Sequence, residues 1–217
     1  MRILFFVVSL SVISQAFAHQ PVMDMAPRWN GGYGIQTRVE YANSETETWV
    51  EGVYTFKPSV RMTLKAPFKD GKLGDAIFAV PLKRYTNRGA FTSNWGVTPS
   101  VRMPTGDGND WDPGLSMSYS SEQPRLYQFY DLYHLGDDNG LDINIGLVNR
   151  DGKGSSTYYL LDISAKDTPS GDRVLSGPIF VYFKRNVVFR AEYKFDVYDN
   201  DDEWEGNFAS LGIGIVY

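Results

Sequence analysis

The decisive stretch is Val187-Val188-Phe189-Arg190-Ala191-Glu192-Tyr193-Lys194-Phe195-Asp196-Val197, a run in which two kinds of side chain alternate. Every second residue from its first to its last is apolar, and Arg190, Glu192, Lys194 and Asp196 stand between them. Successive side chains of a β-strand point to opposite faces, so a period of two is the signature of a strand. This stretch therefore predicts a strand with one apolar face and one charged face.

The same period recurs along the chain, and no window after Ala18 keeps the i, i+3, i+4, i+7 spacing of an amphipathic helix. We therefore predict an all-β fold, an antiparallel transmembrane β-barrel of about 12 strands. Several predicted strands reach the roughly 9–11 residues that cross a bilayer at a tilt. The predicted strands are 32–42, 47–57, 59–67, 75–85, 90–104, 114–121, 125–135, 140–150, 156–166, 173–185, 187–198 and 207–217.

Residues 1–18 have the composition of a secretory signal peptide. Arg2 supplies a positive charge, residues 3–13 form an apolar run too short to span a bilayer, and Ala16-Phe17-Ala18 is a small-residue cleavage site. We expect cleavage after Ala18, a periplasmic leader over 19–32 and a barrel over 33–217. The absence of cysteine fits the Gram-negative outer membrane better than an animal extracellular space.

The predicted connections differ in length, as in outer-membrane barrels with short periplasmic turns and longer outer loops. The tight ones are 57–59, 121–124 and 185–186, and the longer, acidic ones are 105–113, 166–172 and 199–206. The last strand ends on Tyr217, which resembles the C-terminal strand of outer-membrane barrels. The alternative is a soluble periplasmic β-sandwich with its apolar faces packed together, but twelve long strands leave little room for its crossovers.

In a membrane barrel the apolar faces meet lipid and the polar faces line the lumen. Aromatic residues near the short turns would form an interfacial girdle: Tyr33, Phe56, Phe91, Tyr119, Tyr127, Tyr159, Phe183, Phe189 and Tyr217. The predicted lumen-lining residues are charges within the strands: Arg38, Glu40, Glu51, Lys65, Asp75, Arg102, Asp142, Asp162, Arg190, Glu192 and Lys194. We expect them either to pair into a plug or to line a narrow aqueous passage. Phe180, Tyr182 and Trp49 are also predicted to face inward.

Two stretches go beyond a generic barrel. Residues 73–85 (LGDAIFAVPLKRY) resemble the "G-D-hydrophobic … K-Y-R" strand of the outer-membrane family named MetA-pathway of phenol degradation. Residues 104–107 (PTGD) and 111–115 (WDPGL) are similar to that family's "L-P-T-G-D … W-D-x-G-L" segment. The resemblance covers about residues 60–120. It implies an outer-membrane barrel that helps small, often aromatic or apolar compounds across the envelope.

Composition excludes several classes of protein. A mean hydropathy of -0.31 excludes a helical membrane bundle, and the lack of cysteine excludes a thiolate metal site. A net charge of -5 argues against a nucleic-acid partner. We expect a passive channel or transporter for small molecules, with outer-membrane lipid and a small solute as partners and with neither an enzymatic activity nor a cofactor.

Two other functions stay open at this stage. His19 as the mature N-terminus, with Met23 and Met25 after it, offers soft ligands for copper. A lipid hydrolase would need His134 as base and one of Ser116, Ser118 or Ser120 as nucleophile. The Asp107, Asp110 and Asp112 triplet lacks the terminal Glu of a calcium loop, so a solvated acidic turn is expected there.

Overall fold

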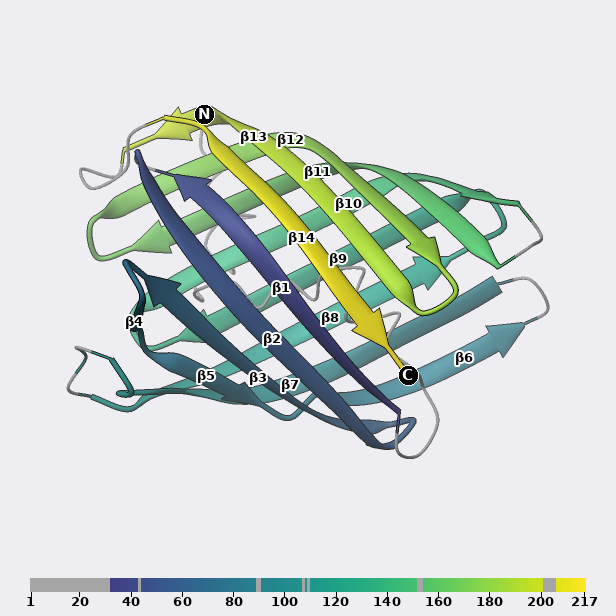
Figure 1. Cartoon of the computed structure of the whole chain (residues 1–217), viewed down its shortest axis with the longest axis horizontal. Coiled ribbons are helices and arrows are strands. Elements are labelled where there is room, and N and C mark those ends of the chain that lie inside the picture. The colour runs from purple at the N-terminus through teal and green to yellow at the C-terminus, as the bar shows by residue number, and fades with distance from the viewer. Residues whose placement is uncertain are drawn as a thin grey trace, which may run out of the picture.

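The described residues form one antiparallel sheet that closes on itself (Figure 1). The computed structural model describes residues 32–42, 44–88, 91–106, 108, 110–151, 154–200 and 206–217. β2 pairs with both β1 and β3, and this second pairing closes the ring. Within this part of the chain there is no helix long and apolar enough to cross a membrane. The strands are β1 (Tyr33–Ala42), β2 (Glu45–Lys57), β3 (Val60–Lys69), β4 (Lys72–Leu73), β5 (Ala76–Ala79), β6 (Leu82–Arg88), β7 (Phe91–Met103), β8 (Asp112–Glu122), β9 (Leu126–Leu135), β10 (Asp138–Arg150), β11 (Ser155–Thr168), β12 (Gly171–Lys184), β13 (Val187–Asp199) and β14 (Phe208–Val216).

Three short strands together form the fourth strand of the barrel. β4, β5 and β6 follow one another between β3 and β7, so the fourteen segments make the twelve strands that the sequence predicts. The predicted strand 75–85 is interrupted at Gly74-Asp75 and at Val80-Pro81. Pro81 has no N–H to donate to a ladder, which explains the second break. Pairing resumes at once, since the Pro81 carbonyl accepts from Arg61 N at 3.0 Å.

The two ends of the barrel differ. At one end, which we call the terminal end, lie the start of β1, the end of β14 and the turns 58–59, 123–125 and 185–186. At the other, the loop end, β7 and β13 lead into the longer connections before β8 and β14. The predicted loop 166–172 is wrong, because β11 and β12 continue through it and leave only residues 169–170 as a turn.

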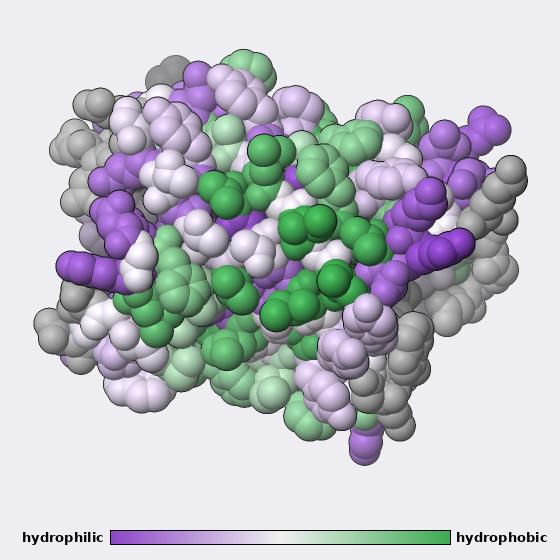
Figure 2. All heavy atoms as spheres, viewed as in Figure 1, coloured by the Kyte–Doolittle hydropathy of each residue, from purple (hydrophilic) through white to green (hydrophobic). Residues whose placement is uncertain are grey.

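The wall is apolar outside and charged inside, the reverse of a soluble barrel. Exposed side chains in the middle of β14 and β11 include Leu211, Ile213 and Leu161, each more than half exposed. Inward positions on the same strands carry buried Ser210, Asp162 and Ser164. Figure 2 shows hydrophobic side chains across the middle of the front wall, with hydrophilic ones mainly toward the two ends. This pattern matches a lipid-facing band around a polar lumen.

The predicted aromatic girdle needs two corrections. Tyr33, Phe56, Tyr119, Tyr159, Phe189 and Tyr217 are exposed on the outer face as predicted. Tyr127 and Phe183 instead lie on the inward-facing series of β9 and β12 and pack inside the barrel. Phe180 and Tyr182, both predicted to face inward, belong instead to the outward series of β12, and the Phe180 ring contacts Tyr159 and Phe189.

We expect Ile213→Lys to lower the free energy of unfolding by about 2–4 kcal/mol, the cost of a cation at the bilayer midplane. Ile213 is 59% exposed near the middle of β14, where this cost is largest. The matched control is Val197→Lys, since Val197 is exposed close to the loop end of β13 and the cost there falls to about 0–1 kcal/mol. Urea unfolding in lipid vesicles measures both. Equal losses in the two variants would contradict the lipid-facing assignment.

Candidate functional site

A cavity of about 250 Å³ lies in the loop half of the lumen. Most of its lining comes from β1–β3 and β10–β13, with Ile77 of β5 and Phe208 of β14 between them. It is lined by Arg38, Glu40, Ala42, Glu47, Trp49, Lys65, Ile77, Asp142, Asp162, Ser164, Lys166, Arg173, Leu175, Arg190, Glu192, Lys194 and Phe208. Eleven of these side chains are basic or acidic, so charge dominates the site.

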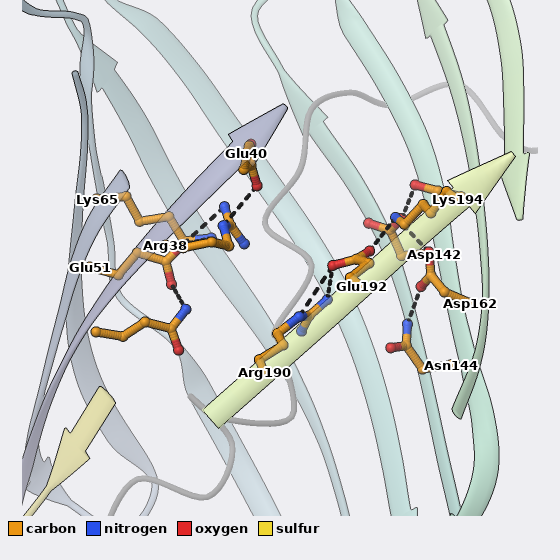
Figure 3. A network of polar contacts seen from close by, with 12 residues as sticks. Arg38, Glu40, Glu51, Lys65, Asp142, Asn144, Asp162, Arg190, Glu192 and Lys194 are labelled. Carbon is orange, nitrogen blue, oxygen red and sulfur yellow. Dashed lines mark hydrogen bonds and ion pairs between the residues drawn. The ribbon is translucent and has the colours of Figure 1, made fainter. Parts of the chain in front are cut away.

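The first group of charges comes from β1, β2 and β3. Glu51 is fully buried, and its carboxylate lies 3.3 Å from Arg38 Nη2 and 3.6 Å from Lys65 Nζ (Figure 3). Gln36 Nε2 donates a further hydrogen bond to Glu51 at 3.3 Å. Arg38 Nε also lies 2.7 Å from Glu40, and its guanidinium stacks over the Trp49 ring at 5.9 Å. A buried carboxylate is tolerable here because two cations and an amide compensate the loss of water.

The second group comes from β11 and β13. Glu192 binds Arg190 Nη2 at 2.6 Å and Lys194 Nζ at 3.0 Å. Lys194 also reaches Asp162 on β11 at 2.5 Å, although β12 runs between the two strands. Gly177 of β12 stands opposite Asp162 and has no side chain, which lets the ion pair pass over it. A Cβ at Gly177 would lie 2.0 Å from the Tyr193 carbonyl, so no larger residue fits.

Two cross-strand pairs of like charge stand on the cavity wall toward the loop end. Glu40 of β1 is opposite Glu47 of β2, and Lys166 of β11 is opposite Arg173 of β12. Like charges directly opposite each other destabilise a sheet. Sequence reasoning missed Glu47, Lys166 and Arg173. The signal for Lys166 was present, since it continues the alternation of Asp162 and Ser164.

The terminal half of the lumen contains an apolar cluster. The cluster consists of Tyr127, Phe129, Val148, Tyr158, Leu160, Ile179, Val181 and Val188, with Phe183 packed against it. All of these residues belong to β9–β13. On β3–β8 the inward residues at this level are polar, and they include Arg61, Lys83, Asn94, Thr98 and Ser118, all buried. Side chains from the two walls therefore narrow the lumen to a constriction.

Asp75 and Arg102, predicted to line the lumen, are not among the side chains that line this cavity. Asp75 Oδ1 accepts from Gly106 N at 2.9 Å and so holds the connection after β7 against the break between β4 and β5. Gly106 is required there, since a Cβ would lie 2.7 Å from Gly74 Cα. Arg102 joins β7 to Asp112 at 3.1 Å and to Asp138 at 3.0 Å near the loop end.

The residues of a hydrolase are not brought together. Ser116, Ser118 and Ser120 are buried on the inward face of β8. His134 belongs to the outward-facing series of β9, between the buried Tyr133 and Leu135. A strand separates adjacent side chains onto opposite faces, so the imidazole and these hydroxyls are on opposite sides of the wall. The copper ligands His19, Met23 and Met25 lie outside the described residues, and that prediction is untested.

Comparisons with known proteins place the chain by fold. No family model and no curated protein matches the sequence. Among solved structures, a KdgM porin in complex with disordered oligogalacturonate has a TM-score of 0.56 at 12% identity, covering 85% of this chain and 99% of that one. A NanC porin has a TM-score of 0.50 at 12% identity, covering 83% and 98%. The chain shares the barrel fold of these porins, whereas the MetA-pathway resemblance is not confirmed.

Proposed function

We propose that this protein is a passive outer-membrane channel for small hydrophilic molecules. The observation that carries the proposal is the charged cavity enclosed by a closed barrel whose outer face is apolar. An apolar outer band requires lipid around the wall, and a wall of both charge signs inside it offers hydration and pairing to a polar solute. The porin fold of the structural neighbours supports the same function.

The charged lining favours a hydrophilic solute over an apolar one. An apolar compound that enters the cavity makes no compensating hydrogen bonds while it displaces water from buried charges. The aromatic or apolar solute implied by the MetA-pathway resemblance therefore stays a prediction without support from the cavity. A solute that leaves toward the terminal end must pass between the apolar cluster and the polar wall of β3–β8, and this constriction predicts small unitary conductance.

Planar-bilayer recording of the refolded protein tests the proposal. We expect small, stable unitary steps whose ion selectivity shifts toward anions in Glu192→Ala and toward cations in Arg190→Ala, because each variant removes one charge from the cavity wall. Lys184→Gln is the control, since Lys184 is exposed at the terminal end of β12, outside the cavity. If the correctly folded protein shows no conductance, or if neither cavity variant changes the ion selectivity, a channel through this lumen is contradicted.

A further inference from the structure

The charges of the cavity balance in number, and most of them are joined in ion pairs. Six basic and five acidic residues line it. Glu51 is not part of the lining, but it forms ion pairs with two of the basic residues, Arg38 and Lys65, and so supplies a sixth negative charge. The site as a whole is therefore neutral. A neutral site gives no net attraction to an anion or to a cation, so its selectivity depends on where each sign is placed.

The two like-charge pairs stand on different parts of the cavity wall, which we call its acidic side and its basic side, although on the acidic side Arg38 also binds Glu40 at 2.7 Å. Glu40 and Glu47 stand together on β1–β2, and Lys166 and Arg173 stand together on β11–β12. Each arrangement costs free energy by itself, since like charges are adjacent across strands. A ligand group of opposite charge placed between the members of a pair would remove that repulsion.

Lys166 has bonding capacity left for such a group. No hydrogen bond or ion pair joins its ammonium to any residue in the described ranges, although Glu40 and Asp142 line the same cavity. Lys166 lines the cavity, and within the described ranges its three N–H donors have no hydrogen-bond acceptor. On the acidic side, Glu47 accepts a hydrogen bond from Trp49 Nε1 at 2.8 Å, which fixes its carboxylate at the wall. Glu47 makes no ion pair among the described residues.

We propose that the cavity binds small zwitterions of the α-amino acid class, a substrate class that rests on the proposed channel function. The ligand carboxylate binds between Lys166 and Arg173, and its ammonium binds between Glu40 and Glu47. Lys166 and Glu40 line the same cavity and no ion pair joins them among the described residues, so a ligand that carries both charges pairs with both sides of this cavity. The volume of about 250 Å³ lies below the roughly 300–1,000 Å³ of pockets for drug-sized ligands, which restricts the ligand to a few heavy atoms.

Four solutes of almost equal size test this assignment: L-alanine (zwitterion), lactate (anion), alaninamide (cation) and lactamide (uncharged). Binding to the refolded full-length barrel is measured by saturation-transfer NMR with competition, and permeation is measured separately by swelling of proteoliposomes. We expect L-alanine to bind at least about tenfold more tightly than each of the other three, since only alanine pairs with both sides. Alanine is also expected to permeate fastest.

Two conservative variants assign the two sides. Lys166→Gln is expected to lose the preference for alanine over alaninamide, because the ligand carboxylate no longer gains a cation. Glu47→Gln is expected to lose the preference for alanine over lactate while it keeps a hydrogen-bond partner for Trp49. Lys184→Gln, at the other end of the barrel, should leave all preferences unchanged.

The two readouts separate this inference from the channel function. Permeation of all four solutes at equal rates, with no difference in binding, overturns the zwitterion site and leaves the channel standing. Alanine binding that responds to both variants without permeation supports the site and overturns the channel. Preferences that survive both Lys166→Gln and Glu47→Gln overturn the proposed orientation.

Discussion

Conductance is expected to rise several-fold when Phe129 and Tyr158 are both replaced by alanine. Phe129 is fully buried and Tyr158 nearly so, and both belong to the apolar cluster that narrows the terminal half of the lumen. Truncating two aromatic side chains opens space beside the polar wall, and water that enters it can hydrate a passing ion. Single-channel recording in planar bilayers measures the unitary step directly.

Trp95→Ala is the matched control for that result. Trp95 is a large aromatic residue on β7, but it is 51% exposed on the outer face. Its loss removes contacts with lipid and leaves the lumen unchanged, so conductance should stay at the wild-type value. Equal conductance in the wild type and in the double variant would show that the cluster does not limit the passage.

Glu51→Gln is expected to lower the free energy of unfolding by about 3–5 kcal/mol, the usual cost of breaking a buried ion pair. Glu51 is fully buried between Arg38 at 3.3 Å and Lys65 at 3.6 Å. The amide keeps the shape of the side chain but carries no charge, so Lys65 loses a carboxylate that lies 3.6 Å from its Nζ. Urea unfolding in lipid vesicles gives the difference.

Two further variants identify the cause of that loss. Glu45→Gln removes a carboxylate from the exposed pair with Lys69 and should leave stability unchanged, because solvent screens that pair. Adding Lys65→Met to Glu51→Gln should recover part of the loss, since the buried cation that has lost the Glu51 carboxylate is then gone. A double variant as unstable as the sum of the two single variants would mean that Glu51 and Lys65 do not interact.

Much of the fold was predictable because strand geometry is local. The alternation in 187–197 alone separates Arg190, Glu192 and Lys194 from Phe189 and Tyr193, and the structure has these residues on opposite faces of β13. The tight turns at 58–59 and 185–186 were also predicted, since Pro58 and the Arg185-Asn186 pair interrupt the apolar pattern. The count of twelve strands follows from the same period.

The errors arose where a residue's role depends on neighbours that are distant in sequence. Residues 166–172 are polar enough to look like a loop. In the structure residues 166–168 continue β11 and pair with residues 171–173 of β12, which brings Lys166 opposite Arg173. Tyr127 and Phe183 look like interfacial aromatics, yet the register of β9 and β12 turns them inward. The hydrogen bond that Asp75 accepts from the backbone of Gly106, 31 residues away, was likewise not predictable from either segment alone.

The sequence by itself determined which residues share a face of each strand and which face carries charge, because a period of two is a property of the extended backbone. Only the tertiary structure decided which charges meet. The stagger between strands places Lys194 against Asp162 across Gly177, and closure of the ring brings the acidic pair of β1–β2 and the basic pair of β11–β12 to one cavity. Those contacts depend on the register and shear of the closed barrel. All strands together set these two quantities, so the sequence of a single strand does not determine them.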